Sequence, residues 1–434
     1  MIGTTHSTLP ELSLRANFSW TLAGNLVYAG CQWGMLVVLA KLGSPEMVGQ
    51  FALGLAVTAP IMLFANLQLR GIQVTDARRE YQFGDYLRLR LITTLLALLA
   101  IAGIALASGY RWETTLVIIA LGIAKAIESI SDIFYGLLQQ HERMDRIAKS
   151  MMIKGALSLG ILSAGVYATG SVMLGAAGLA AAWATILACY DIPNGILLLR
   201  RMPQPSASAH TQARTLQRWD RAALTKLVWM ALPLGLVMLL ISLNTNIPRY
   251  FIERYQGGRE LGIFAALAYL IVAGNTVASA LGQSASSRLA KYYAAGDNPA
   301  FRNLLLKLAG IGALMGAVGI LAALVAGRSI LTLLYRPEYA AYVDVFVLLV
   351  IDAGLGFVAS FLGYGMSAAR YFRIQLPLFI LVTGAAVLMC IFLVPSQGLY
   401  GAAIALIISS IVQLIGSLAI IAHALRALQR HAGQ

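Results

Sequence analysis

Long apolar stretches recur along the whole chain, and short polar stretches separate them. Each apolar stretch has about 20 residues or more, which is the length of an α-helix that crosses the hydrocarbon core of a membrane. The pattern therefore predicts twelve membrane-spanning helices. Their expected ranges are 18–40, 46–68, 89–109, 114–138, 150–168, 172–198, 225–248, 260–284, 303–326, 343–365, 374–394 and 397–424.

Composition agrees with this pattern and excludes a soluble protein. Of the 434 residues, 59% are hydrophobic and 12% are charged, and the mean hydropathy is +0.76. Soluble domains carry about 25% charged residues. We therefore expect an all-α polytopic membrane protein with no domain outside the membrane.

The basic residues predict the orientation of the chain. Lys and Arg near the ends of spans collect on the cytoplasmic side. With the N-terminus on that side, 24 of the 32 basic residues fall there and seven fall on the outer side. Both termini are thus predicted to be cytoplasmic. We attribute most of the net charge of +14 to topology and to contact with membrane lipids, and we expect no binding of nucleic acid.

Two short motifs each occur twice in the chain. YQFGDYLRLR at 81–90 and YAAGDNPAFR at 293–302 share a Tyr, a Gly-Asp pair and an Arg at the same spacing. GQFAL at 49–53 and GIFAA at 262–266 match at an offset of 213 residues, which is one residue more than the offset of the first pair. The copies sit at equivalent places in two halves of six spans each. An even number of spans makes the two halves a parallel repeat.

This repeat predicts the domain organisation. The run PQPSAS, residues 203–208, has the Pro and Ser content of a flexible linker. We expect one bundle of six helices in residues 1–209 and a second in residues 210–434, pseudo-symmetric and arranged around a central cavity.

Two segments carry a resemblance to a known family. LPLGLVMLLISLNTNIPRYFIERYQGGRELGIFAALAYL, residues 232–270, resembles the seventh and eighth helices of the polysaccharide-transporter branch of the multidrug/oligosaccharidyl-lipid/polysaccharide flippase superfamily, which includes O-antigen flippases. AIESISDIFYGLLQQHERMDRIAKS, residues 126–150, is similar to its fourth helix and the loop that follows. The resemblance is specific in these segments and extends to the layout of most of the chain.

The resemblance implies a transporter of the bacterial inner membrane that is not an enzyme and needs no cofactor. Its cargo would be undecaprenyl-pyrophosphate-linked oligosaccharide, an O-antigen or exopolysaccharide repeat unit, flipped from the cytoplasmic to the periplasmic leaflet. Alternating access between two bundles would move it. A glycan polymerase would be a partner, and H⁺ or Na⁺ a coupling ion.

Two other functions stay open at this point. An ion-coupled multidrug antiporter of the same superfamily would have the same layout. A membrane-embedded glycan polymerase or ligase would need a sizeable outer loop, but the longest one expected here, around 327–342, has only about 16 residues.

Charged residues inside spans are the candidates for ion coupling, because each costs about 2.5–3.5 kcal/mol at the centre of a helix. Lys125, Glu128 and Asp132 lie on one face of the fourth span, which we expect to face the cavity. Asp191 in the sixth span and Asp352 in the tenth complete the set. Alternatively, Lys125 and Glu128 merely neutralise each other, in which case Asp132 has no partner.

Arginines near the ends of spans are the candidates for binding the pyrophosphate, since the planar guanidinium holds phosphate oxygens with two hydrogen bonds. Arg70 and Arg288 end the second and eighth spans on the cytoplasmic side and form the expected capture pair. Arg249 and Arg254, with Asn246 one turn below Arg249, form the expected outer pair. The alternative is that these arginines only anchor the helix ends.

The cysteines and histidines predict no further chemistry. Cys31, Cys189 and Cys390 all fall within expected spans, where small packing side chains are more common than disulfides. The five histidines lie in loops, tails or at a span end without the spacing of metal ligands. We expect no metal site.

Overall fold

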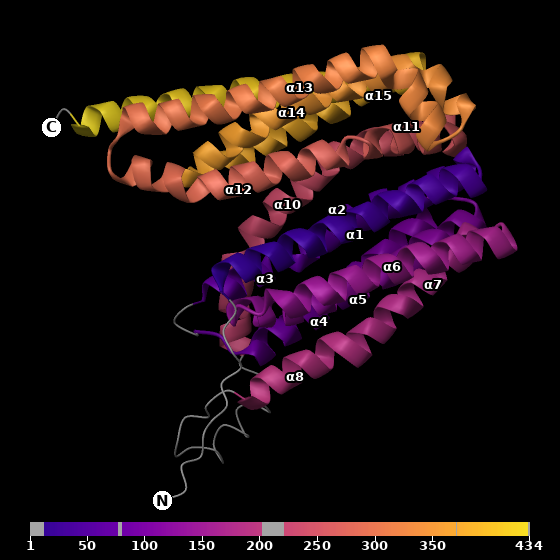
Figure 1. Ribbon diagram of the computed structural model, residues 1–434, viewed down its shortest axis with the longest axis horizontal. Coiled ribbons are helices and arrows are strands. Elements are labelled where there is room, and N and C mark those ends of the chain that lie inside the picture. The colour runs from indigo at the N-terminus through magenta and orange to yellow at the C-terminus, as the bar shows by residue number, and fades with distance from the viewer. Residues whose placement is uncertain (1–12, 77–79, 202–220, 370, 433–434) are drawn as a thin grey trace, which may run out of the picture. The chain divides into compact units, whose positions relative to one another are not determined.

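The apolar stretches form long α-helices in the computed structural model, which describes residues 13–76, 80–201, 221–369 and 371–432 (Figure 1). Within these ranges the chain has helices and no β-strand. The elements are α1 (Leu14–Leu42), α2 (Pro45–Asn66), α3 (Leu69–Thr75), α4 (Phe83–Ala107), α5 (Trp112–Gln140), α6 (Met144–Thr169), α7 (Val172–Ile186), the π-helix η1 (Leu187–Asp191), α8 (Ile192–Arg201), α10 (Arg221–Gln256), α11 (Gly258–Tyr269), α12 (Val272–Ala294), α13 (Asn298–Leu334), the 3₁₀-helix η2 (Pro337–Tyr342), α14 (Val343–Ala368) and α15 (Phe372–Ala432).

The number of spans agrees with the sequence pattern. In the described ranges, nine helical segments are long and apolar enough to cross a membrane, and the bent pair α11 and α12 makes a tenth. The helix α5 has 29 residues, enough for a further span. The predicted all-α membrane fold with about twelve spans is confirmed.

The last helix, α15, contains two spans because the chain reverses at Gly398, whose φ of 54° and ψ of −127° are not helical. The Ser409 hydroxyl donates a hydrogen bond to the carbonyl oxygen of Val382, 3.1 Å away. In one straight helix these two residues would be about 40 Å apart. The two parts of α15 are therefore antiparallel, as the separate ranges 374–394 and 397–424 predict.

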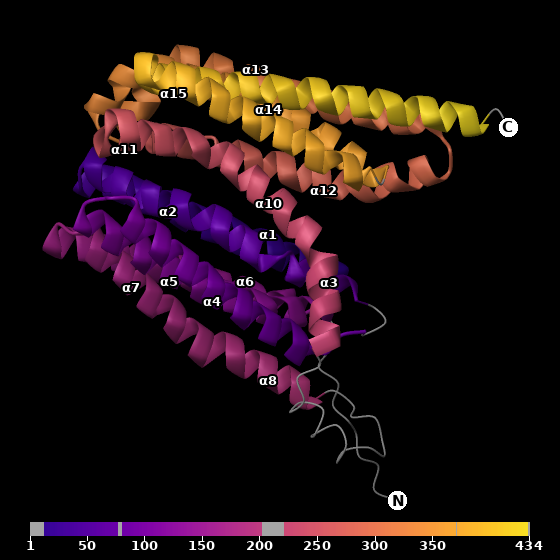
Figure 2. The same cartoon turned by 180° about the vertical axis from the view of Figure 1, so that it is seen from behind.

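The helices divide into two compact units. The first unit contains residues 1–35 and 57–236. Its central element is α5, which packs against α3, α4, α6, α7 and α8. Figures 1 and 2 show α5 and α6 side by side from both directions. The buried side chains of α5 include Ile133, Leu137 and Leu138, so this helix is both the core of the unit and the carrier of its polar residues.

The second unit contains residues 36–56 and 237–434. Its central element is α14, which packs against α11, α12, α13 and α15. Gly316 of α13 and Gly354 of α14 allow a close approach, since a Cβ on Gly316 would lie 2.7 Å from the Gly354 Cα. Figure 2 shows α13, α14 and α15 running alongside one another.

The predicted domain boundary near residue 210 lies outside the described residues. The division into 1–209 and 210–434 stays a prediction, as does the orientation with both termini in the cytoplasm. The two compact units have other boundaries, because α1, α2 and α10 each contribute residues to both units.

Candidate functional site

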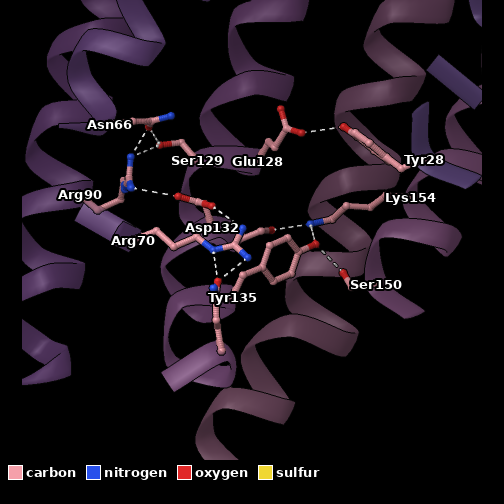
Figure 3. A network of polar contacts seen from close by, with 12 residues as sticks. Tyr28, Asn66, Arg70, Arg90, Glu128, Ser129, Asp132, Tyr135, Ser150 and Lys154 are labelled. Carbon is pink, nitrogen blue, oxygen red and sulfur yellow. Dashed lines mark hydrogen bonds and ion pairs between the residues drawn. The ribbon is translucent and has the colours of Figure 1, made fainter. Parts of the chain in front are cut away.

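The polar side chains of α5 that the sequence places on one face lie among those of neighbouring helices of the first unit (Figure 3). Residues three and four apart on a helix share a face. Glu128, Asp132 and Tyr135 follow this spacing and point toward groups from α1, α3, α4 and α6. The result is a polar network of three neighbouring parts inside an otherwise apolar bundle.

Asp132 lies at the centre of one part of this network. Arg70 Nη1 donates to Asp132 Oδ1 over 3.1 Å, and Arg90 Nη2 donates to Asp132 Oδ2 over 3.2 Å. One carboxylate therefore serves two guanidinium groups, one from α3 and one from α4. The two guanidinium groups differ in access, because the Arg70 side chain is 30% exposed and the Arg90 side chain is 0% exposed.

Neutral side chains hold the Arg90 guanidinium on its other edge. Arg90 Nη1 donates to Asn66 Oδ1, and it lies 3.3 Å from the Ser129 hydroxyl. Ser129 in turn donates to Asn66 Oδ1 over 2.6 Å. A buried charge is stable only when it is paired and hydrogen-bonded, and this arrangement provides both for Arg90.

A break between α2 and α3 positions Arg70. Leu67 and Gln68 have φ values of 49° and 52°, which end α2 and separate it from the short helix α3. Gly136 of α5 provides the space, because a Cβ there would lie 3.4 Å from the Arg70 Cγ and would overlap Gln73. Arg70 Nε and Nη2 then donate to Gln139 Oε1, over 3.0 and 2.8 Å.

Glu128 forms a second part of the network. Lys125 Nζ donates to Glu128 Oε2 over 2.7 Å. The Tyr28 hydroxyl of α1 donates to the other carboxylate oxygen over 2.6 Å. The predicted neutralisation of Lys125 by Glu128 is present, and the tyrosine adds a contact from a different helix.

Lys154 and Asp191 form the third and most buried part. Their side chains are 3% and 0% exposed, and Lys154 Nζ lies 2.8 Å from Asp191 Oδ2. Lys154 also donates to Ser131 over 2.7 Å and to the Tyr135 hydroxyl over 2.9 Å. Ser150 donates to the second oxygen of Asp191 over 2.6 Å, so this ion pair is fully hydrogen-bonded.

A local irregularity places Asp191 in this position. The π-helix η1 adds one residue per turn and ends at Asp191, between α7 and α8. Single π-helical turns within α-helices occur frequently at functional sites. Here the irregular turn belongs to the element that supplies the carboxylate for Lys154.

The network carries an excess of positive charge. It contains four basic side chains and three carboxylates, which are Arg70, Arg90, Lys125 and Lys154 with Glu128, Asp132 and Asp191. Of the basic groups, Arg70 and Lys125 are about equally accessible, at 30% and 28% exposed. Arg70 also lines a cavity of about 80 Å³ together with Thr21 and Asn25. The chemistry available here is the binding of an anion by an accessible guanidinium.

The expectation that Asp132 has no partner is wrong. A helical wheel of α5 shows only the neighbours on the same helix, whereas the two partners of Asp132 come from α3 and α4. Arg70 is accordingly more than an anchor at the end of a span, since its guanidinium binds Asp132 and Gln139.

Sequence reasoning missed two members of the network, Arg90 and Lys154, because it counted both as cytoplasmic topology charges. Both are buried in the bundle. A signal was present for Lys154, since Ser150, Lys154 and Ser158 are spaced four residues apart and form a polar stripe on α6. The sequence signal for Arg90 was weaker, because Arg90 is the second residue of its expected span, where a basic residue is usual.

The candidates of the second unit do not form one cluster among the described residues. Arg249 Nη1 donates to Asn246 Oδ1 over 3.2 Å, both on α10. Arg254 and Arg288 are exposed. Asp352 accepts a hydrogen bond from Ser410 over 2.6 Å.

The described part of the chain holds no group of three or more His, Cys, Asp or Glu residues that could bind a metal ion. Cys31, Cys189 and Cys390 are free thiols.

Comparison with known proteins places the chain in a family. The family model for polysaccharide biosynthesis proteins matches residues 14–287. The capsular polysaccharide biosynthesis protein CapF of Staphylococcus aureus is 29% identical over 401 residues, which cover 92% of this chain and 97% of CapF.

Solved structures share the fold. An inward-facing multidrug resistance transporter of the MATE family and MOP superfamily superposes with a TM-score of 0.72 at 13% identity, covering 94% of this chain and 99% of that chain. A mutant of the Vibrio cholerae MATE transporter VcmN has a TM-score of 0.63 at 14% identity, with 96% of each chain covered. The chain belongs to the polysaccharide biosynthesis protein family.

Proposed function

We propose that this protein flips undecaprenyl-pyrophosphate-linked oligosaccharide units from the cytoplasmic to the periplasmic leaflet of the bacterial inner membrane by alternating access. Membership of the polysaccharide family and the likeness to a capsular polysaccharide biosynthesis protein support a cargo used in surface glycan assembly. The transporter-like fold supports movement of the cargo rather than its chemical conversion.

The observation that carries the proposal is the sharing of Asp132 by Arg70 and Arg90. Two guanidinium groups on one carboxylate leave a positive charge that a second anion can neutralise. Arg70 is the accessible member of the pair, and its planar fork suits phosphate oxygens. A pyrophosphate headgroup would replace Asp132 at Arg70, while the buried Arg90 would keep Asp132 in place.

Deletion of the gene in its native host tests this function. We expect loss of the surface polysaccharide and accumulation of its lipid-linked repeat unit, because units made on the cytoplasmic side can no longer reach the outer leaflet. The measurements are surface glycan on gels and lipid-linked intermediates by mass spectrometry. Expression of the intact chain from a plasmid is the control.

The same deletion strain distinguishes the second candidate, an ion-coupled multidrug antiporter, which the likeness to MATE transporters favours. Hypersensitivity to cationic drugs with normal surface glycan would contradict the flippase proposal. Normal lipid-linked intermediates in the deletion strain would contradict it as well.

We further propose that Asp352 takes part in coupling to H⁺ or Na⁺. The carboxylates Glu128, Asp132 and Asp191 each have a cationic partner. Asp352, within the part of the chain that the structure describes, has a hydrogen bond from Ser410 and no ion pair. A membrane carboxylate without a fixed cation can exchange a small cation when its surroundings change.

Replacing Arg249 tests the proposed outer binding pair. Arg249 Nη1 contacts Asn246, but its Nε is buried without a partner in the described structure. Arg249→Lys keeps the charge and removes the bidentate fork, so we expect surface glycan to fall by about tenfold, the equivalent of one charge-assisted hydrogen bond. The assay is quantitative glycan staining against membrane protein level.

The exposed Arg328, on the same predicted side, supplies the matched control. Arg328→Lys should leave the glycan unchanged. Wild-type glycan in both Arg249→Lys and Arg249→Ala would remove Arg249 from the binding site.

A further inference from the structure

Two helix starts from different copies of the sequence repeat cross closely within the second unit. They are the first two turns of α2 and of α11, and each follows a loop predicted to lie on the outer side. Gly49 and Gly262 lie at the crossing. These two glycines are also equivalent residues of the repeat, because they begin the copies GQFAL and GIFAA.

Only glycine fits at the crossing. A Cβ on Gly49 would overlap the carbonyl oxygen of Gly258 and would lie 3.2 Å from the Gly262 nitrogen. A Cβ on Gly262 would overlap the carbonyl oxygen of Pro45 and would lie 2.8 Å from the Gly49 nitrogen. These obstacles are backbone atoms, so no change of side-chain rotamer relieves the overlap. A methyl group at either position would have to push the helices apart.

The contact is reciprocal with respect to the repeat. Pro45 and Gly258 are separated by the same 213 residues as Gly49 and Gly262. Residue 49 meets residue 258 while residue 45 meets residue 262, which is the pattern of a contact around a two-fold axis. A parallel repeat has its axis along the membrane normal. The crossing therefore lies on the pseudo-symmetry axis of these two helices.

Weak ion pairs surround the crossing. Arg259 Nε lies 3.9 Å from Glu46, and the Arg259 guanidinium also lies 3.1 Å from Glu338 and 3.1 Å from Glu260. The side chains of Arg259 and Glu46 are 45% and 54% exposed. Ion pairs with this exposure contribute little to stability, so they guide the two helix starts together without fixing them.

We propose that the Gly49–Gly262 crossing is a closure point on the predicted outer side, where α2 and α11 meet in the present state and separate in the opposite state. The inference rests on the alternating access proposed above. Close backbone contact on the axis leaves no path between the two helices, and a rim of weak ion pairs permits opening. A closure point at these glycines also explains why the motif Gly-x-Phe-Ala, in GQFAL and GIFAA, occurs in both halves.

Cross-linking tests this proposal directly. The background is a variant without Cys31, Cys189 and Cys390, into which Glu46→Cys and Arg259→Cys are introduced together. A short bifunctional maleimide joins the two new cysteines irreversibly, and an oxidant joins them reversibly as a disulfide. We expect efficient cross-linking and loss of glycan export in the cross-linked protein. Reduction of the oxidised form should restore export.

The control joins two elements of the same half. Tyr400 of α15 donates to Asp344 of α14 over 3.3 Å, so Tyr400→Cys with Asp344→Cys should cross-link without effect on export. Wild-type export by the cross-linked Glu46/Arg259 pair would overturn the proposal, because the two helix starts would then not need to separate.

Alanine at the glycines tests the close contact itself. Gly49→Ala and Gly262→Ala should lower the yield of the Glu46/Arg259 cross-link by about tenfold, the usual effect of overpacking one methyl group. Gly356→Ala is the control, since a Cβ there meets nothing within 4 Å. An unchanged yield would overturn the proposal. The yield is measured without any cargo, so it separates a failure of this inference from a failure of the flippase assignment.

Discussion

Asp191→Ala is expected to destabilise the protein by about 3–5 kcal/mol, the usual effect of removing one partner of a buried ion pair. Lys154 would keep its charge in a position that is 3% exposed. Its remaining contacts, Ser131 and Tyr135, are neutral. Thermal unfolding of the purified protein in detergent, followed by size-exclusion fluorescence, measures the change.

The double variant Lys154→Gln with Asp191→Asn is the informative comparison. It removes both charges and keeps groups that can hydrogen-bond to the surrounding hydroxyls, so it should recover most of the stability. The exposed pair of Arg111 and Glu113 supplies the control, because Glu113→Ala should change stability by less than about 1 kcal/mol. An unfolding temperature equal to that of the wild type in Asp191→Ala would contradict the prediction that the buried pair of Lys154 and Asp191 stabilises the fold.

Asp132→Asn is expected to abolish glycan export while leaving the protein folded in the membrane. The amide keeps an oxygen that can accept a hydrogen bond from Arg90, and Asn66 and Ser129 remain in contact with the same guanidinium. Because Arg90 loses its counter-ion, the membrane level of the variant is measured together with export. The substitution removes the negative charge that competes with a phosphate for Arg70. Headgroup binding should become about tenfold tighter, and release should fail. Binding of undecaprenyl pyrophosphate to the purified protein and export in cells are the two measurements.

Arg70→Gln should act in the opposite direction on binding. It removes the accessible guanidinium, so affinity for the same lipid should fall by about tenfold while export is also lost. Arg15, an exposed residue of α1 on the same predicted side, provides the control as Arg15→Gln. Full export by Asp132→Asn, or equal affinity in both variants, would contradict the exchange of Asp132 for a phosphate at Arg70.

The sequence by itself determined the membrane class and the helices, because both depend on local properties. Twenty apolar residues in a row must form a helix in a bilayer, since every backbone polar group has to be satisfied within the segment. Spacing along one helix also sufficed to place Lys125, Glu128 and Asp132 on one face of α5. The repeat of Gly49 and Gly262 was equally visible in the sequence.

Only the tertiary structure decided what these residues contact. The partners of Asp132 come from α3 and α4, and the partner of Lys154 comes from a π-helix between α7 and α8. No spacing rule within one helix connects residues that are 37 to 62 positions apart. The same limit applies to Gly49 and Gly262, because a matched motif shows that two positions are equivalent and not that they touch. Contacts between helices depend on how apolar surfaces pack, which is a property of the whole bundle rather than of any one segment.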